Sequence, residues 1–210
     1  DQVHVELGRH GLIDLGQELL ELAGSVSSLD GVDDKASGHI ERGEHEDVLA
    51  LYDRGFRNKD SALFQAIPDL YIDVQNAASM LFRLQRQGVD VGDRWVELAD
   101  KAEARIGDCL SPFTLPHWMM ALAATRRFEA GGRMLEAMRK YSAGTTINAR
   151  MVREYAMPIS EALLLRARGD PAAACRVMRP AIGGMYRLGG SHAQQQVLWM
   201  MYRDSAAKVH

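Results

Sequence analysis

Apolar residues recur at spacings of three and four along most of the chain. Four leucines follow this spacing over residues 12–22, and Met and Leu follow it over residues 134–138. Such spacing places the apolar side chains on one face of an α-helix. No stretch alternates apolar and polar residues for long enough to predict a strand. The pattern therefore predicts an all-α protein.

Breaks in the pattern divide the chain into short helices. We expect helices over residues 11–24, 36–42, 45–57, 70–87, 92–107, 114–127, 129–143, 158–168, 171–187 and 191–207. Polar loops are expected over residues 25–35 and 58–68. Pro158 is expected to begin its helix, because proline is tolerated in the first turn.

The turns between these helices resemble one another. A helix end is followed by Gly8 and, 35 residues later, by Gly43, and similar turns lie at Arg127 and Arg168. Glycine is favoured there because the residue after a helix commonly adopts the left-handed conformation. This period predicts a right-handed α-solenoid of tetratricopeptide-like helix pairs.

We expect a single helical-repeat domain over residues 1–210, with about five helix pairs, the first of them truncated. An array that begins within a pair is expected of a piece of a longer repeat protein, or of a protein whose partner covers that end.

Composition narrows the class of protein. Hydrophobic residues make up 47% and charged residues 25%, which excludes disordered and collagen-like chains. No apolar run is long enough to cross a membrane, and the chain does not open with a signal peptide. Two cysteines, Cys109 and Cys175, are too few for a disulfide framework. A cytoplasmic protein without a membrane partner is predicted.

Charge is divided unevenly between the two halves of the chain. Residues 1–100 hold 9 of the 25 basic and 20 of the 28 acidic residues. The basic second half suggests an anionic ligand, a head-to-tail homodimer, or simply differently charged solvated faces. No basic run exceeds two residues, so no nucleic-acid partner is expected.

Several stretches in a fixed order resemble a known family. They are Gly43–Glu46 with Leu49–Asp53, Ser79–Gln85 followed by Gly88–Trp95, Phe113–His117, Met157–Pro158 and Leu188–Gln194. On these residues the chain resembles the C-terminal half of the tetratricopeptide repeat protein 38 family, as a divergent member. The resemblance implies a curved solenoid with a concave groove, and polar residues at several helix starts that suggest a ligand or catalytic pocket.

The chain departs from the family where acidic residues are usual. Asn76 replaces an Asp, Thr114-Leu115 replaces Asn-Asp, and Gln195-Gln196 replaces Arg-Asp, while Asp30–Asp34 replaces a His-Asn-x-Trp-His stretch. His117, His192 and Gln194 remain. Loss of the acidic groups favours binding over catalysis.

Each candidate site residue has both a functional and a structural interpretation. His192 and Gln194 would face the groove beside helix-start N–H groups that favour an anion, or Gln194 would only complete a capping box with Ser191. His117 would act as a ligand or acid–base group, or would only pack in the core. Trp118 would floor the pocket or pack between helices.

Three polar residues of one predicted helix complete the candidate ligand-binding set. Asp73 and Asn76 lie three residues apart and hence on one face, with Arg83 further along. They would line the groove, or they are ordinary polar positions on a half-exposed helix.

No metal or cofactor is expected. His117 and His192 lie two helix pairs apart, too far for one zinc ion, and no third ligand has a suitable spacing. Nucleophile, phosphate-loop and dinucleotide motifs are missing from the sequence.

The sequence predicts a tetratricopeptide-repeat binding protein that holds a small molecule or peptide in its concave groove. The alternative is a small-molecule enzyme, for example of a biosynthetic pathway, that uses His117 or His192 for acid–base chemistry. A structural subunit of a longer array is the third interpretation. Whether the protein is an enzyme is left open.

Overall fold

The computed structural model describes residues 39–57 and 71–209, and within them every regular element is helical. The α-helices are α2 (His45–Phe56), α4 (Tyr71–Arg86), α5 (Arg94–Ala104), α6 (Thr114–Ala124), α7 (Phe128–Ser142), α8 (Ile147–Met151), α9 (Met157–Ala167), α10 (Pro171–Ile182) and α11 (His192–Ala206). This confirms the all-α class. The first predicted helix pair and the loops over residues 25–35 and 58–68 lie outside the described residues.

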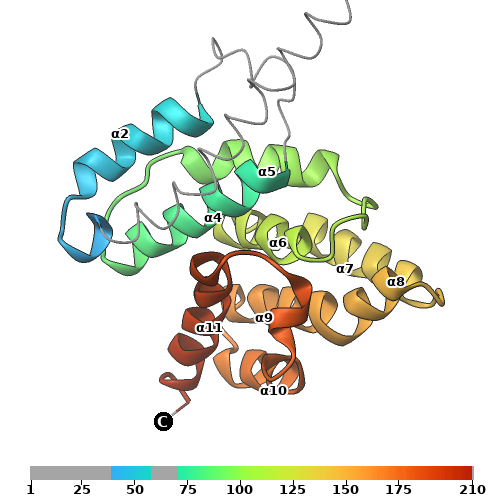
Figure 1. Ribbon diagram of the computed structural model, residues 1–210. Coiled ribbons are helices and arrows are strands. Elements are labelled where there is room, and N and C mark those ends of the chain that lie inside the picture. Colours follow the sequence, from blue (N-terminus) through green and yellow to red (C-terminus); the bar gives the residue numbers. More distant parts are fainter. Residues whose placement is uncertain (1–38, 58–70, 210) are drawn as a thin grey trace, which may run out of the picture.

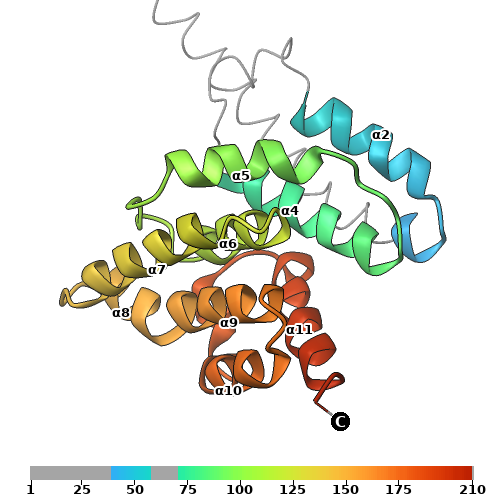
Figure 2. The ribbon, with the colours of Figure 1, turned by 180° about the vertical axis from the view of Figure 1, so that it is seen from behind.

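Successive helices form packed pairs. α4 packs against α5, α6 against α7, and α9 against α10. Figures 1 and 2 show α6 in the middle of the molecule, between α4 and α5 on one side and α9 to α11 on the other. The first helices of successive pairs also touch, α4 with α6 and α6 with α9.

Helix α6 forms the centre of the core. Every residue from Thr114 to Ala123 is buried, and none of them carries a charge. A helix that is apolar on all sides is stable only when it is covered on all sides. Contacts with α4, α5, α7 and α9 provide that cover.

Helix α11 returns to α4, which lies far from it in the sequence. Gln194 bonds to Asn76, and Arg86 bonds to Asp204; both pairs are 118 residues apart. The two helices therefore run parallel, because the sequence separation between contacting residues stays constant only in a parallel pair. In an antiparallel pair this separation changes from one contact to the next. α11 also contacts α9, so α4, α6, α9 and α11 form a closed circuit of contacts, here called the inner helices.

The repeated turns share one backbone geometry. Gly43, Gly88 and Gly169 follow helix ends with φ of 80°, 80° and 89°, and the next residue donates its N–H to a carbonyl five positions earlier. After α6 this position is occupied by Arg126, with φ of 57°. A side chain in the left-handed region costs roughly 1 kcal/mol relative to glycine. The glycine turn predicted at Gly43 is therefore confirmed, and Arg126 is its exception.

The helix predicted to begin at Pro158 begins earlier, so that prediction is wrong. α8 continues into α9 through a π-helical turn, Val152–Ala156. Proline has no N–H, and its ring collides with the carbonyl four residues before it in a regular helix. The wider turn, in which the Met157 N–H reaches the Val152 carbonyl, lets the helix pass through the proline.

Candidate functional site

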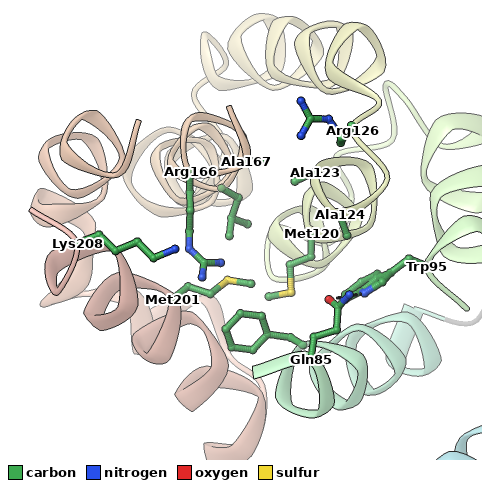
Figure 3. A pocket seen from close by; sticks show the side chains of 12 residues that line it. Gln85, Trp95, Met120, Ala123, Ala124, Arg126, Arg166, Ala167, Met201 and Lys208 are labelled. Carbon is green, nitrogen blue, oxygen red and sulfur yellow. Dashed lines mark hydrogen bonds between the residues drawn. The ribbon is translucent and has the colours of Figure 1, made fainter. Parts of the chain in front are cut away.

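A cavity of about 340 Å³ lies where the carboxyl ends of the four inner helices meet. Figure 3 shows the side chains around it. Helix α4 contributes two lining residues, α5 one, α6 three, α9 three and α11 one, and two more follow α6 and α11. They are Phe82, Gln85, Trp95, Met120, Ala123, Ala124, Arg126, Leu163, Arg166, Ala167, Met201 and Lys208. A volume in this range is typical of small-molecule sites.

Much of the cavity wall is apolar and held in place by packing. Phe82, Met120 and Met201 are buried and belong to three different inner helices. Trp95 is also buried, and its indole Nε1 donates to Gln85 Oε1 at 2.8 Å. This bond ties the start of α5 to the end of α4 and satisfies the polar edge of an otherwise apolar ring.

The charged side chains that line the cavity are all basic. They are Arg126, Arg166 and Lys208, and no aspartate or glutamate is among the described lining residues. Arg126 and Lys208 are exposed, whereas Arg166 is half-buried. Burial lowers the pKa of Arg166, and the carboxylate of Asp204 partly offsets this, but an arginine remains charged at neutral pH.

Arg166 is incompletely paired. Its Nε is buried and has no hydrogen-bond partner among the described residues. Its Nη2 lies 3.9 Å from Asp204 Oδ2, beyond hydrogen-bond distance, and its guanidinium lies 5.8 Å from the centre of the Phe82 ring. Asp204 is already bound by Arg86, with Nε to Oδ2 at 3.0 Å. Arg166 therefore lines the cavity with a guanidinium that Asp204 does not hydrogen-bond, while its Nε is enclosed by the core.

Helix dipoles reduce the positive charge of the cavity but do not cancel it. Four helix carboxyl ends, each equivalent to about half a negative charge, contribute about −2 in total. The side chains of Arg126, Arg166 and Lys208 carry three positive charges, while Arg86 and Asp204 neutralise each other. The amino end of α5, at Trp95, adds about half a positive charge, so the balance stays positive.

Three of the predicted site residues meet elsewhere, at the amino-terminal end of α11. Gln194 Nε2 donates to Asn76 Oδ1 at 2.7 Å, and Arg83 Nη2 donates to the Ala193 carbonyl at 2.7 Å. Gln194 also forms the capping box with Ser191 that the sequence predicts. These side chains are buried, so here they act as ties between α4 and α11.

His117 and Trp118 are core residues of α6. His117 is fully buried; its Nδ1 donates to the Phe113 carbonyl at 2.9 Å, and its Nε2 has no partner among the described residues. Burial lowers the pKa of His117 to about 4, so the ring is neutral at pH 7. Trp118 is 1% exposed.

His192 and Asp73 are the remaining predicted residues. His192 is the exposed first residue of α11. Asp73 lies in α4, and its side chain is outside the described part of the structure. None of the other six predicted residues is among the described residues that line the cavity.

The sequence analysis missed the basic residues of the cavity. Arg126, Arg166 and Lys208 each lie near a helix end, where basic residues are common because they offset the helix dipole. One signal was available. Arg126 precedes Arg127 at the turn position where Gly43, Gly88 and Gly169 stand in the other helix ends, and a side chain retained at such a position suggests a use for it.

No group of three or more metal-binding side chains is assembled in residues 39–57 and 71–209. Within the same residues, no helix combines the length and apolar character needed to cross a bilayer.

No protein-family model matches the chain, and no solved structure matches it. The class that the fold and cavity define is therefore an all-helical protein of packed helix pairs, with a basic, partly apolar cavity among four inner helices. The resemblance to the tetratricopeptide repeat protein 38 family stays a prediction.

Proposed function

We propose that this protein is a right-handed α-solenoid of tetratricopeptide-like helix pairs that binds a small molecule without transforming it. The inner helices α4, α6 and α9 would line the concave groove. α11, parallel to α4 and tied to it, closes that groove over the cavity. The paired helices and the shared turn geometry support a repeat origin, as the family resemblance also suggests.

The observation that carries the proposal is the cavity itself. It combines buried apolar walls with three cations and lies where four inner helices meet, so its shape depends on rigid elements. At roughly 30 Å³ for each non-hydrogen atom, such a volume holds about a dozen of them. That size favours a small molecule over a peptide.

Acid–base catalysis by His117 or His192 has less support. His117 is enclosed by the core on every side, and His192 lies on the surface at the opposite end of α11 from the cavity. A general base must come within hydrogen-bond reach of its substrate. Neither imidazole lines the cavity that a substrate would occupy.

A blocking substitution tests the proposal. Ala124 is exposed, ends α6 and lines the cavity, so Ala124→Trp places a bulky ring at the opening. Ala143, also exposed and next to a helix end, is outside the lining and provides the matched control Ala143→Trp. Both variants are titrated with 8-aminonaphthalene-1-sulfonate, a fluorescent dye close in size to the cavity.

We expect the unmodified protein and Ala143→Trp to bind one equivalent of the dye, and Ala124→Trp to lose at least about tenfold in affinity. Failure of the unmodified protein to bind, or equal binding by Ala124→Trp, would refute the proposed pocket function.

Native mass spectrometry at two ionic strengths tests the homodimer, which we propose forms through the acidic and basic halves.

A further inference from the structure

The proposed pocket function leaves the chemistry of the ligand open, and the following inference rests on it. We infer that the cavity binds a monoanionic carboxylate with an apolar body, whose carboxylate is held by the guanidinium of Arg166.

The terminal nitrogens of Arg166 are the donors available to a ligand. The side chain lines the cavity, and its Nη2 stays 3.9 Å from Asp204 Oδ2, beyond hydrogen-bond distance. Its Nε is enclosed by the core, which leaves the Nη1 and Nη2 end of the guanidinium for the ligand. These two nitrogens match the two oxygens of a carboxylate, which accepts both bonds in one plane.

The neighbouring acid cannot take this role. Both oxygens of Asp204 are engaged by Arg86, at distances between 3.0 and 3.2 Å. Asp204 is therefore held by Arg86 and does not hydrogen-bond Arg166. A ligand is the partner that the terminal nitrogens of Arg166 can take.

The charges around Arg166 favour a single negative charge on the ligand. The cavity is basic, because the helix dipoles offset only part of the charge of its three cations. The carboxylate of Asp204 close to Arg166 repels a second negative charge on the ligand. A carboxylate therefore suits the site better than a dianionic phosphate ester.

The walls next to Arg166 accept an apolar chain. Figure 3 shows the Arg166 side chain reaching toward Met201 and Met120. Methionine side chains are flexible and adapt to ligands of irregular shape. Arg126 and Lys208 are exposed on the cavity rim, where they attract an anion from solution.

Ligands that differ only in their head group test this inference. Decanoate, decan-1-ol, decylamine and decyl phosphate are titrated calorimetrically into the full-length protein and into Arg166→Gln and Arg166→Lys. The second variant keeps the charge but loses the planar fork. Arg168→Gln is the matched control, because Arg168 is an exposed arginine two residues further on that does not line the cavity.

We expect decanoate to bind at least about tenfold more tightly than decan-1-ol, decylamine and decyl phosphate. Arg166→Gln should weaken decanoate by about ten- to a hundredfold and leave decan-1-ol unchanged, and Arg166→Lys should fall between. Arg168→Gln should bind decanoate as the unmodified protein does. Thermal melting of each variant shows whether it is folded.

Equal binding of decanoate and decan-1-ol, tighter binding of decyl phosphate, or an Arg166→Gln variant with full affinity for decanoate would overturn the inference. So would dye binding without binding of any of the four alkyl compounds. In each of these cases the dye result shows that the pocket function stands. If the dye itself does not bind, both proposals fail.

Discussion

At the scale of single residues, His117 links burial to acid sensitivity. Its Nδ1 is bonded to Phe113, and no charged partner compensates a proton added at Nε2. Burial lowers its pKa from 6.5 to about 4. Between these values the unfolded chain binds a proton that the folded protein does not. The stability contributed by a neutral His117 is therefore complete above about pH 6.5 and is lost as the pH falls.

Replacing His117 should remove this acid sensitivity. For the unmodified protein relative to His117→Gln, we expect the free energy of unfolding to fall by an extra 2 kcal/mol or so, about 1.4 kcal/mol per pH unit, between about pH 7 and pH 5. Urea unfolding measured at several pH values provides the test. His192→Gln, at an exposed position, should keep the unmodified slope. Identical slopes for His117→Gln and the unmodified protein would contradict the assignment.

The backbone of Arg126 adopts a conformation that is unfavourable for an arginine. Its φ of 57° places an arginine where three other turns have glycine. Arg126→Gly should stabilise the protein by about 0.5–1 kcal/mol, because glycine adopts this conformation without strain. Arg126→Ala removes the same charged group but keeps the backbone cost, so it should show no such gain. Chemical denaturation of both variants decides the matter, and equal stabilities would rule out strain at this turn.

At the scale of elements, the turn before α11 depends on close packing against α6. Gly189 and Gly190 have φ of 89° and 85°. A Cβ at Gly190 would lie 2.2 Å from the Phe113 ring, whereas a Cβ at Gly189 would meet nothing within 4 Å. The two glycines share the conformational requirement, but only Gly190 also carries a steric one.

This contrast makes a paired prediction. Both Gly189→Ala and Gly190→Ala pay for positive φ, but Gly190→Ala must also displace the ring of Phe113, which packs on His117 with centroids 4.8 Å apart. We expect Gly190→Ala to lower the free energy of unfolding by about 1–3 kcal/mol more than Gly189→Ala does, because overpacking a core usually costs this much. Thermal unfolding of the two variants compares them, and equal losses would mean that the turn can shift away from α6.

The positions of the helices are easier to predict from the sequence than whether two successive helices are continuous. The predicted helices over residues 45–57, 70–87 and 129–143 correspond to α2, α4 and α7, because each has an apolar stripe and a clear turn at its end. The helix predicted over 171–187 corresponds to α10, which ends earlier, at Ile182. The break predicted before Pro158 does not occur. The preference of proline for the first turn of a helix does not predict this π-helical turn, which packs against neighbouring helices. The turn accommodates the missing proline N–H and the bulk of the proline ring.

At the scale of the whole molecule, α11 at the carboxyl end of the described chain is tied back to α4. The buried bond between Gln194 and Asn76 spans 118 residues. A double-mutant cycle with Asn76→Ala and Gln194→Ala should give a coupling energy of about 0.5–1.5 kcal/mol, because each side chain loses its buried partner when the other is removed. Strictly additive losses in urea unfolding would show that α11 is not held by this bond.

The uneven charge of the sequence is also partly resolved at this scale. Arg127 of the basic half pairs with Asp100 of the acidic half, and Arg86 of the acidic half pairs with Asp204 of the basic half. These are exposed or half-buried pairs, each worth little in free energy. Part of the complementarity that suggested a dimer is therefore satisfied within one chain.

The sequence by itself determined the helical class, most helix positions and the turns, because these depend on spacings within about four residues. It also singled out Asn76, Arg83 and Gln194, which do meet. Only the tertiary structure decided that these residues tie α4 to α11, that His117 is enclosed, and that a basic cavity forms elsewhere. The cavity is lined by residues from five helices, and no local sequence pattern predicts which helix ends lie together in the folded protein.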